Sequence, residues 1–153
     1  MFRCKKIFTI SVLTIGILLL SVVFAQSSKE IATVIVHIKG FRNNKGVARI
    51  TLFDKKKGFP NKYKLALAYG DSPVQDSVSQ FIFHNVVYGK YSIGVFHDED
   101  SNGKLKSNII GMPREGIGVS NNVRASMGPP KFKDCLFPVD RDTVEVTIDL
   151  NYL

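Results

Sequence analysis

An acidic segment with the spacing of a calcium-binding loop is the clearest candidate for chemistry in this sequence. Asp98, Asp100 and Asn102 stand at alternate positions and Gly103 follows directly, as in the first half of a D-x-[DN]-x-[DN]-G calcium loop. Ca²⁺ takes six to eight oxygen ligands, and alternate side chains in a tight turn can converge on one point. The backbone carbonyl of Lys104 is a further candidate ligand. The segment therefore predicts a Ca²⁺ site.

The second half of the calcium pattern is incomplete. Ile109 stands where a bidentate Glu is expected, and Lys106 places a cation near the predicted ion. Glu115, six residues beyond Ile109, is the candidate for the missing carboxylate. Because the segment is short of anions, we expect any site to be weak. The alternative is an Asx-rich turn whose side chains bond to the backbone of their own loop.

The acidic segment opens a long loop over residues 98–130, rich in Gly, Pro and Asn. Long loops without regular structure are usually functional or disordered, and the composition of this one is unlike that of a linker. Arg114 and Glu115 are candidates for binding a polar ligand, but bonds from side chains to the backbone are the favoured role. The candidate loop-ordering residues are Gly103, Arg114, Ser120, Asn121 and Asn122.

Residues suited to catalysis are not arranged in a recognisable site. His37, His84 and His97 fall on three different predicted strands, without the spacing of a zinc site. His97 and Asp98 are adjacent on a strand, so their side chains should point to opposite faces. Ser120 lacks the final glycine of a nucleophile elbow. We therefore predict a protein that is not an enzyme.

A hydrolase is the alternative. Asp98 and Asp100 lie close enough in sequence to share a proton, as a glycosidase pair can. Such an enzyme would act on cell-envelope carbohydrate through Asp98, Asp100 or Glu115, and it requires carboxylates that face each other across a cleft.

Residues 1–25 have the pattern of a secretory signal peptide. Three basic residues precede an uncharged apolar run over residues 7–24, which ends in Val23-Phe24-Ala25 before Gln26. The alternative is a retained membrane anchor, because 18 apolar residues reach the lower limit for spanning a bilayer. We expect cleavage after Ala25 and a periplasmic or extracellular location for the domain formed by residues 26–153.

Charge and cysteine content narrow the range of partners. Removal of 25 of the 153 residues leaves 128, and the net charge falls from +8 to +5 because three basic residues are lost. This excess favours weak attraction to anionic surfaces, but the basic residues are dispersed except for Lys55-Lys56-Lys57. We expect a cell-envelope or extracellular ligand, no nucleic acid, and membrane contact only through the signal segment if it is retained. Cys135 is expected to be a small buried side chain.

Period-two hydrophobic patterns separated by turn signals predict an all-β domain. We expect a two-sheet antiparallel β-sandwich of about seven strands with a Greek-key path, and a small closed barrel is the alternative. Asn43-Asn44-Lys45-Gly46 offers a turn through which the first two strands would pair. The predicted strands are residues 31–39, 47–53, 62–69 (or a short helix), 78–86, 91–97, 131–139 and 143–150.

An ordered series of motifs extends over most of the mature chain. The series runs through Tyr91–His97, Asp98-Glu99-Asp100-Ser101-Asn102-Gly103-Lys104-Leu105, Gly111-Met112-Pro113-Arg114-Glu115-Gly116, Gly118-Val119-Ser120-Asn121-Asn122 and Gly128-Pro129-Pro130-Lys131-Phe132. In these motifs the sequence resembles an exported bacterial family known as domain of unknown function 2141. The resemblance implies a secreted β-sandwich, similar in outline to transthyretin-like, carboxypeptidase-regulatory or immunoglobulin-like domains, with no established activity. It also implies that relatives tend to carry an acid where Lys106 stands.

We predict that the exported chain begins at Gln26, because the residues before it have the pattern that signal peptidases cleave. N-terminal sequencing and intact mass of the protein recovered from an exporting cell check this. A secreted or membrane-bound chain that still carries residues 1–25 would contradict cleavage and favour the anchor.

Overall fold

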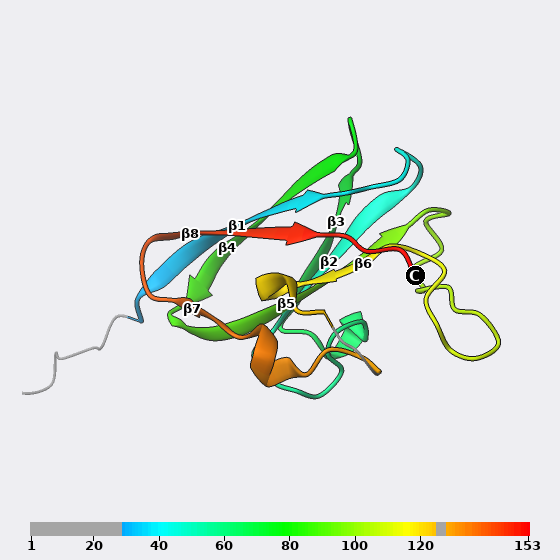
Figure 1. Cartoon of the computed structure of the whole chain (residues 1–153). Coiled ribbons are helices and arrows are strands. Elements are labelled where there is room, and N and C mark those ends of the chain that lie inside the picture. The colour runs from blue at the N-terminus through cyan, green and yellow to red at the C-terminus, as the bar shows by residue number, and fades with distance from the viewer. Residues whose placement is uncertain (1–28, 125–127) are drawn as a thin grey trace, which may run out of the picture.

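The computed structural model describes residues 29–124 and 128–153, which form a β-sandwich of two open sheets (Figure 1). The strands are β1 Ile31–Lys39, β2 Val47–Phe53, β3 Ala68–Pro73, β4 Val78–Val87, β5 Gly89–Asp98, β6 Ile117–Val119, β7 Phe137–Val139 and β8 Thr143–Asp149. One sheet has the order β4-β1-β8, and the other has the order β3-β2-β5-β6 with β7 also paired to β5. The predicted all-β sandwich is confirmed.

Three short 3₁₀ segments complete the described structure: η1 Tyr63–Leu65, η2 Ser120–Asn122 and η3 Phe132–Cys135. Within residues 29–124 and 128–153, no helix has the length and hydropathy needed to cross a bilayer. The predicted signal peptide, residues 1–25, lies outside the described residues.

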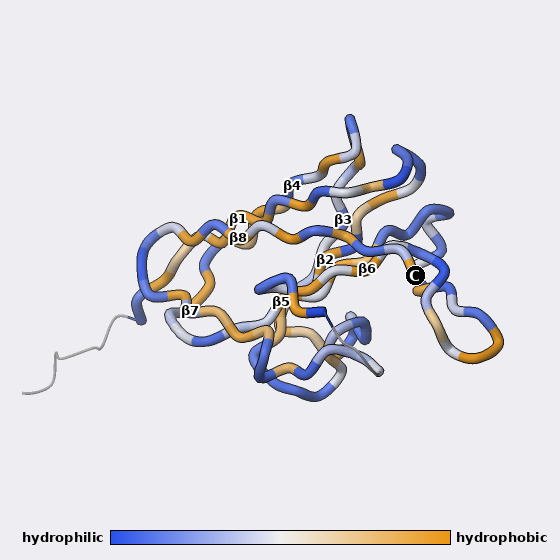
Figure 2. Tube along the Cα trace, viewed as in Figure 1, coloured by the Kyte–Doolittle hydropathy of each residue, from blue (hydrophilic) through white to orange (hydrophobic). Residues whose placement is uncertain are grey.

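The core lies between the sheets because each strand alternates in polarity. On β1, the side chains of Ala32, Val34, Val36 and Ile38 are buried, whereas the residues between them are partly exposed. This is the pattern of a strand with one face on the core. Figure 2 shows hydrophobic residues following the strands and hydrophilic residues gathering in the turns. Strand β5 differs, because every residue from Tyr91 to Asp98 is buried.

The expected hairpin between the first two strands is wrong. Strand β1 pairs with β4 in antiparallel fashion and with β8 in parallel fashion, whereas β2 pairs with β3 and β5. Both β1 and β2 carry an apolar face, and the chain crosses between the sheets so that these faces meet across the core. Gly40 and Gly46 bound the crossing, with φ of +83° and +64°. A Cβ on Gly46 would lie 1.9 Å from the carbonyl oxygen of Asp98, so the two backbones touch there.

The segment after β2 also differs from the prediction. Within residues 62–69, where we expected a strand or a short helix, the structure has η1, and the strand β3 begins only at Ala68 and continues to Pro73. Pro73 is tolerated because β3 is an edge strand that pairs only with β2.

Two further strand predictions were wrong in their detail. The strand expected over residues 131–139 is divided into η3 and the short β7, and β6 forms inside the expected long loop. The parallel pairing of β8 with β1 also departs from a wholly antiparallel sandwich. Cys135 lies in η3 and is fully buried, which confirms the expected packing role. Burial raises the pKa of its thiol to about 11.

The sandwich brings four segments together at the end where β5 finishes. Asp98, the last residue of β5, is opposite Val47 at the start of β2. After the loop, β6 returns beside β5, where the N–H of His97 bonds to the carbonyl of Gly116 at 2.8 Å. The C-terminal segment joins this edge, because Asn151 bridges to Ile117.

We predict that Ile148→Ala lowers the free energy of unfolding by about 2–5 kcal/mol, because Ile148 is fully buried and truncation leaves a cavity. Urea unfolding followed by circular dichroism measures the change. Ile31→Ala is the matched control, since Ile31 is half-exposed, and its effect should stay below about 1 kcal/mol. Equal losses in the two variants would contradict the described core.

Candidate functional site

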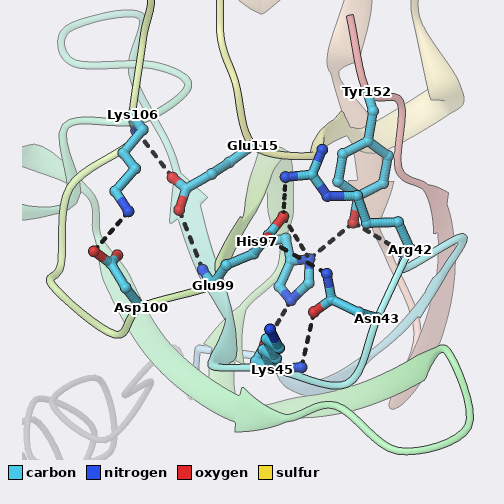
Figure 3. A network of polar contacts seen from close by, with 9 residues as sticks. All are labelled: Arg42, Asn43, Lys45, His97, Glu99, Asp100, Lys106, Glu115 and Tyr152. Atoms are coloured by element: carbon cyan, nitrogen blue, oxygen red, sulfur yellow. Dashed lines mark hydrogen bonds and ion pairs between the residues drawn. The ribbon is translucent and has the colours of Figure 1, made fainter.

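The candidate site is the loop that leaves β5 at Asp98, together with the turn before β2 and the C-terminal segment (Figure 3). The side chains of His97 and Asp98 lie on opposite faces of the sheet. His97 points into the end of the core, where its ring contacts Phe41 edge-on at 5.0 Å between centroids. Asp98 points outward, toward Arg49 of β2. The expectation of opposite faces is confirmed.

Asp98 organises the first turn of the loop although it is completely buried. Its Oδ1 accepts a hydrogen bond from the N–H of Asn102 at 3.0 Å, and its Oδ2 accepts one from the N–H of Gly103 at 2.7 Å. Gly103 has a φ of +76°, which favours glycine. The guanidinium of Arg49 lies 3.4 Å from Asp98 Oδ2, so the buried charge has an ionic partner.

Glu115 joins the two branches of the loop. Its exposed fraction is 2%. Oε1 accepts a hydrogen bond from the N–H of Glu99 at 3.2 Å, and Oε2 accepts one from the N–H of Lys106 at 2.9 Å. Figure 3 shows this carboxylate between the loop segments that carry Glu99 and Lys106. One side chain therefore fixes both the beginning and the middle of the loop.

The carboxylates of Asp98, Asp100 and Glu115 converge. Each offers an oxygen, and these atoms all lie within 4.8 Å of one another. We call these three residues the carboxylate cluster. The ammonium of Lys106 is 2.7 Å from Asp100 Oδ2, and this contact, followed by that of Asn102, holds the pKa of Asp100 below its ordinary value of 3.8. The same contact raises the pKa of Lys106.

The other two residues of the predicted metal site, Asn102 and Lys104, form a turn. Asn102 Oδ1 accepts a hydrogen bond from the N–H of Lys104 at 2.8 Å, which is the Asx-turn bond of the alternative interpretation. The structure thus contains both the turn bonds and the convergence of carboxylates. Three residues of the predicted set, Asp98, Asp100 and Glu115, are brought together, while the Asn102 oxygen serves the backbone.

The later loop-ordering candidates attach η2 to the strands β5 and β8 and to the end of η3. Ser120 Oγ accepts a hydrogen bond from the N–H of Ile93 at 2.9 Å and donates one to the carbonyl of Cys135 at 2.6 Å. Asn121 Nδ2 donates to the carbonyl of Leu136 at 3.0 Å. Asn122 Oδ1 accepts a bond from the N–H of Asp149 at 2.8 Å. Arg114 contributes through its backbone, whose N–H bonds to the carbonyl of Lys106 at 2.9 Å.

A second polar network on the inner face was not predicted from the sequence. His97 Nε2 lies 2.6 Å from the carbonyl oxygen of Lys45, so this nitrogen is the donor. Nδ1 then accepts the hydroxyl of Tyr152 at 2.8 Å, and that hydroxyl oxygen accepts the N–H of Arg42 at 3.1 Å. Burial raises the pKa of Tyr152, which keeps the hydroxyl able to donate.

An ion pair connects this inner network to the loop. Arg42 Nη2 lies 2.6 Å from Glu99 Oε1, and the Arg42 guanidinium stacks 4.8 Å from the centre of the Tyr152 ring. Asn43 Nδ2 donates to Glu99 Oε2 at 3.4 Å. No sequence pattern links the residues of the inner network, because their contacts span 52 to 110 positions along the chain.

The sequence of the chain was compared with models of known protein families, and one family matches. The model of the family described as uncharacterized protein conserved in bacteria (DUF2141) matches residues 36–147. The chain belongs to this family. The resemblance inferred from the motif series is confirmed, and the description of the family gives no activity. No curated protein and no solved structure matches the chain.

The DUF2141 match covers β2 to β7 entirely, the last four of the nine residues of β1 and the first five of the seven residues of β8. It includes the carboxylate cluster, the turn before β2 and η2. Tyr152 lies beyond it, so the inner network of this DUF2141 protein combines matched residues with a C-terminal side chain outside the matched range.

We predict that Tyr152→Phe destabilises the fold by about 1–3 kcal/mol, because the buried Nδ1 of His97 and the N–H of Arg42 lose their partner. Urea unfolding measures the loss. Tyr69→Phe is the control, since Tyr69 is half-exposed and keeps its ring contact with Tyr63. A loss no larger than that of the control would contradict the network.

Proposed function

We propose that this chain is an exported, non-catalytic β-sandwich module that binds its ligand through the loop over residues 98–131, and that the carboxylate cluster binds Ca²⁺. The observation that carries the proposal is the convergence of Asp98, Asp100 and Glu115, whose oxygens lie within 4.8 Å of one another. Bound Ca²⁺ would stabilise the loop that presents the binding surface.

The chemistry of the cluster suits a hard divalent cation. Ca²⁺ prefers carboxylate and carbonyl oxygens, and the cluster supplies three carboxylates from residues 17 positions apart. Glu115 supplies the acid that the sequence lacks at Ile109. Each carboxylate oxygen keeps lone-pair capacity beyond its present hydrogen bond, so the turn bonds of Asp98 and Glu115 are compatible with a bound ion.

Two cationic side chains beside the carboxylate cluster lower the affinity for Ca²⁺ that we expect. The ammonium of Lys106 contacts Asp100, and the guanidinium of Arg49 contacts Asp98. Together they offset much of the charge of three carboxylates, and the affinity of calcium sites follows the charge of the ligands. We expect dissociation constants of about 0.1–1 mM, the range of extracellular calcium modules.

The burial of the carboxylates supports a non-catalytic role. Asp98 and Glu115 are closed to solvent and each accepts two hydrogen bonds from backbone N–H groups. A glycosidase needs two carboxylates that flank an open substrate cleft. Asp100 alone of the three is exposed, so the hydrolase alternative gains no support from this geometry.

We predict that Lys106→Met tightens Ca²⁺ binding by about tenfold, because it removes the cation that competes for Asp100. Isothermal titration calorimetry of the exported chain with CaCl₂ measures the change. Lys104→Met is the matched control, since Lys104 is an exposed lysine two residues away, and its affinity should stay near that of the wild type. Asp100→Asn should weaken binding.

Circular dichroism of each variant verifies the fold before titration. If neither the wild type nor Lys106→Met gives heat at millimolar CaCl₂, the Ca²⁺ proposal is wrong. If Lys104→Met tightens binding as much as Lys106→Met does, the effect is one of general charge and the assignment to the cluster fails.

A further inference from the structure

The outer end of the loop carries hydrophobic side chains that the fold leaves in solvent. Ile109 and Ile110 are 103% and 79% exposed, and Met112 is 43% exposed. Figure 1 shows this part of the loop projecting from the sandwich, and Figure 2 shows a hydrophobic segment at its outer end. Single exposed apolar residues are ordinary, but a contiguous group on a projection marks an interaction surface.

We call residues 107–113, which carry these hydrophobic side chains, the apolar tip. Hydrogen bonds within the tip hold its backbone in a turn. Asn108 Oδ1 accepts hydrogen bonds from the N–H of Ile110 at 3.1 Å and of Met112 at 2.9 Å. The N–H of Asn108 donates to the carbonyl of Met112 at 2.8 Å, and Ser107 bridges to Pro113. These bonds fix the backbone from which the aliphatic side chains project, so that ordering this backbone on binding costs little conformational entropy.

Basic side chains lie at the base of the apolar tip. Residues 104–114 contain Lys104, Lys106 and Arg114 and no acidic residue, and both Lys104 and Arg114 are exposed. An apolar end backed by basic side chains is the arrangement of segments that bind at the surface of anionic membranes. There the aliphatic groups enter the acyl boundary and the cations meet phosphate groups.

We propose that the apolar tip inserts into the surface of an anionic lipid bilayer, with Lys104 and Arg114 at the level of the headgroups. The tip is a narrow projecting turn without aromatic residues, whereas protein interfaces bury broad surfaces and are enriched in aromatic anchors. A bilayer requires no matching groove. This inference goes beyond Ca²⁺ binding and beyond the expectation that only the signal segment meets a membrane.

Co-sedimentation of the exported chain with vesicles tests the proposal. Vesicles of equal phosphatidylcholine and phosphatidylglycerol should bind the chain more tightly than vesicles of phosphatidylcholine alone. The double variant Ile109→Ser/Ile110→Ser should bind at least about tenfold more weakly to the anionic vesicles. Leu65→Ser/Leu67→Ser, which removes 46% and 54% exposed leucines near the opposite end of β2, should bind as the wild type does.

Charge is tested with a second matched pair. Lys104→Gln/Arg114→Gln should lower binding to anionic vesicles by about fivefold for each charge removed, and salt should weaken the binding of the wild type. Lys55→Gln/Lys56→Gln removes the same charge from the far end of β2 and should have a smaller effect. Equal effects of the two pairs would overturn the placement of Lys104 and Arg114 against the headgroups.

A fluorescence reporter tests insertion at the tip itself. The chain has no Trp, so Ile110→Trp provides a single reporter that preserves the apolar character of the position. Its emission should shift to the blue and be quenched by brominated lipids in anionic vesicles, whereas Leu67→Trp should not respond. An unshifted spectrum would overturn the proposal. A shift that depends on protein concentration without lipid would also overturn it, because the tip would then bind a second copy.

Discussion

The loop end of this sandwich depends on buried carboxylates that accept hydrogen bonds from backbone N–H groups. A buried charge is unfavourable unless it is hydrogen-bonded or paired. Asp98 meets this requirement with Asn102, Gly103 and Arg49, and Glu115 meets it with the N–H groups of Glu99 and Lys106. Opening the loop would leave these charges without partners. The same bonds therefore define the conformation of a segment that has almost no regular secondary structure.

The last two residues of β5, His97 and Asp98, make ordering contacts on the two opposite faces of the sheet. Adjacent side chains on a strand point in opposite directions, so His97 holds the inner network while Asp98 holds the outer turn. Gly46 contacts the backbone at Asp98, and Arg42 pairs with Glu99. The turn before β2, the loop and the C-terminal segment consequently form one connected unit, although each leaves the sandwich from a different strand.

The sequence predicts the strand bounds that local periodicity controls, but it does not predict the strand pairing and the side-chain contacts that depend on residues far away in the chain. The bounds of β1 and β2 are as predicted, because alternation of apolar and polar residues records which face each strand buries. Their pairing was mispredicted, because a shared apolar face fits a neighbour across the core as well as one in the same sheet. Strands β6 and β7 have three residues each, too few for a period to appear. Glu115 was a candidate from its charge, but Tyr152 had no local signal, since only the fold places it beside His97.

Lys106 contacts both the carboxylate cluster and the base of the apolar tip. Its N–H bonds to Glu115, its carbonyl accepts the N–H of Arg114 at the base of the apolar tip, and its ammonium contacts Asp100. The two backbone bonds do not require a particular side chain, whereas the charge of the side chain bears on both of the proposed binding sites. A carboxylate at this position would preserve the backbone bonds, increase the negative charge of the carboxylate cluster and remove a cation behind the tip. A cation at position 106 therefore disfavours the proposed Ca²⁺ site and favours the proposed contact with an anionic surface, and a carboxylate there would reverse both effects.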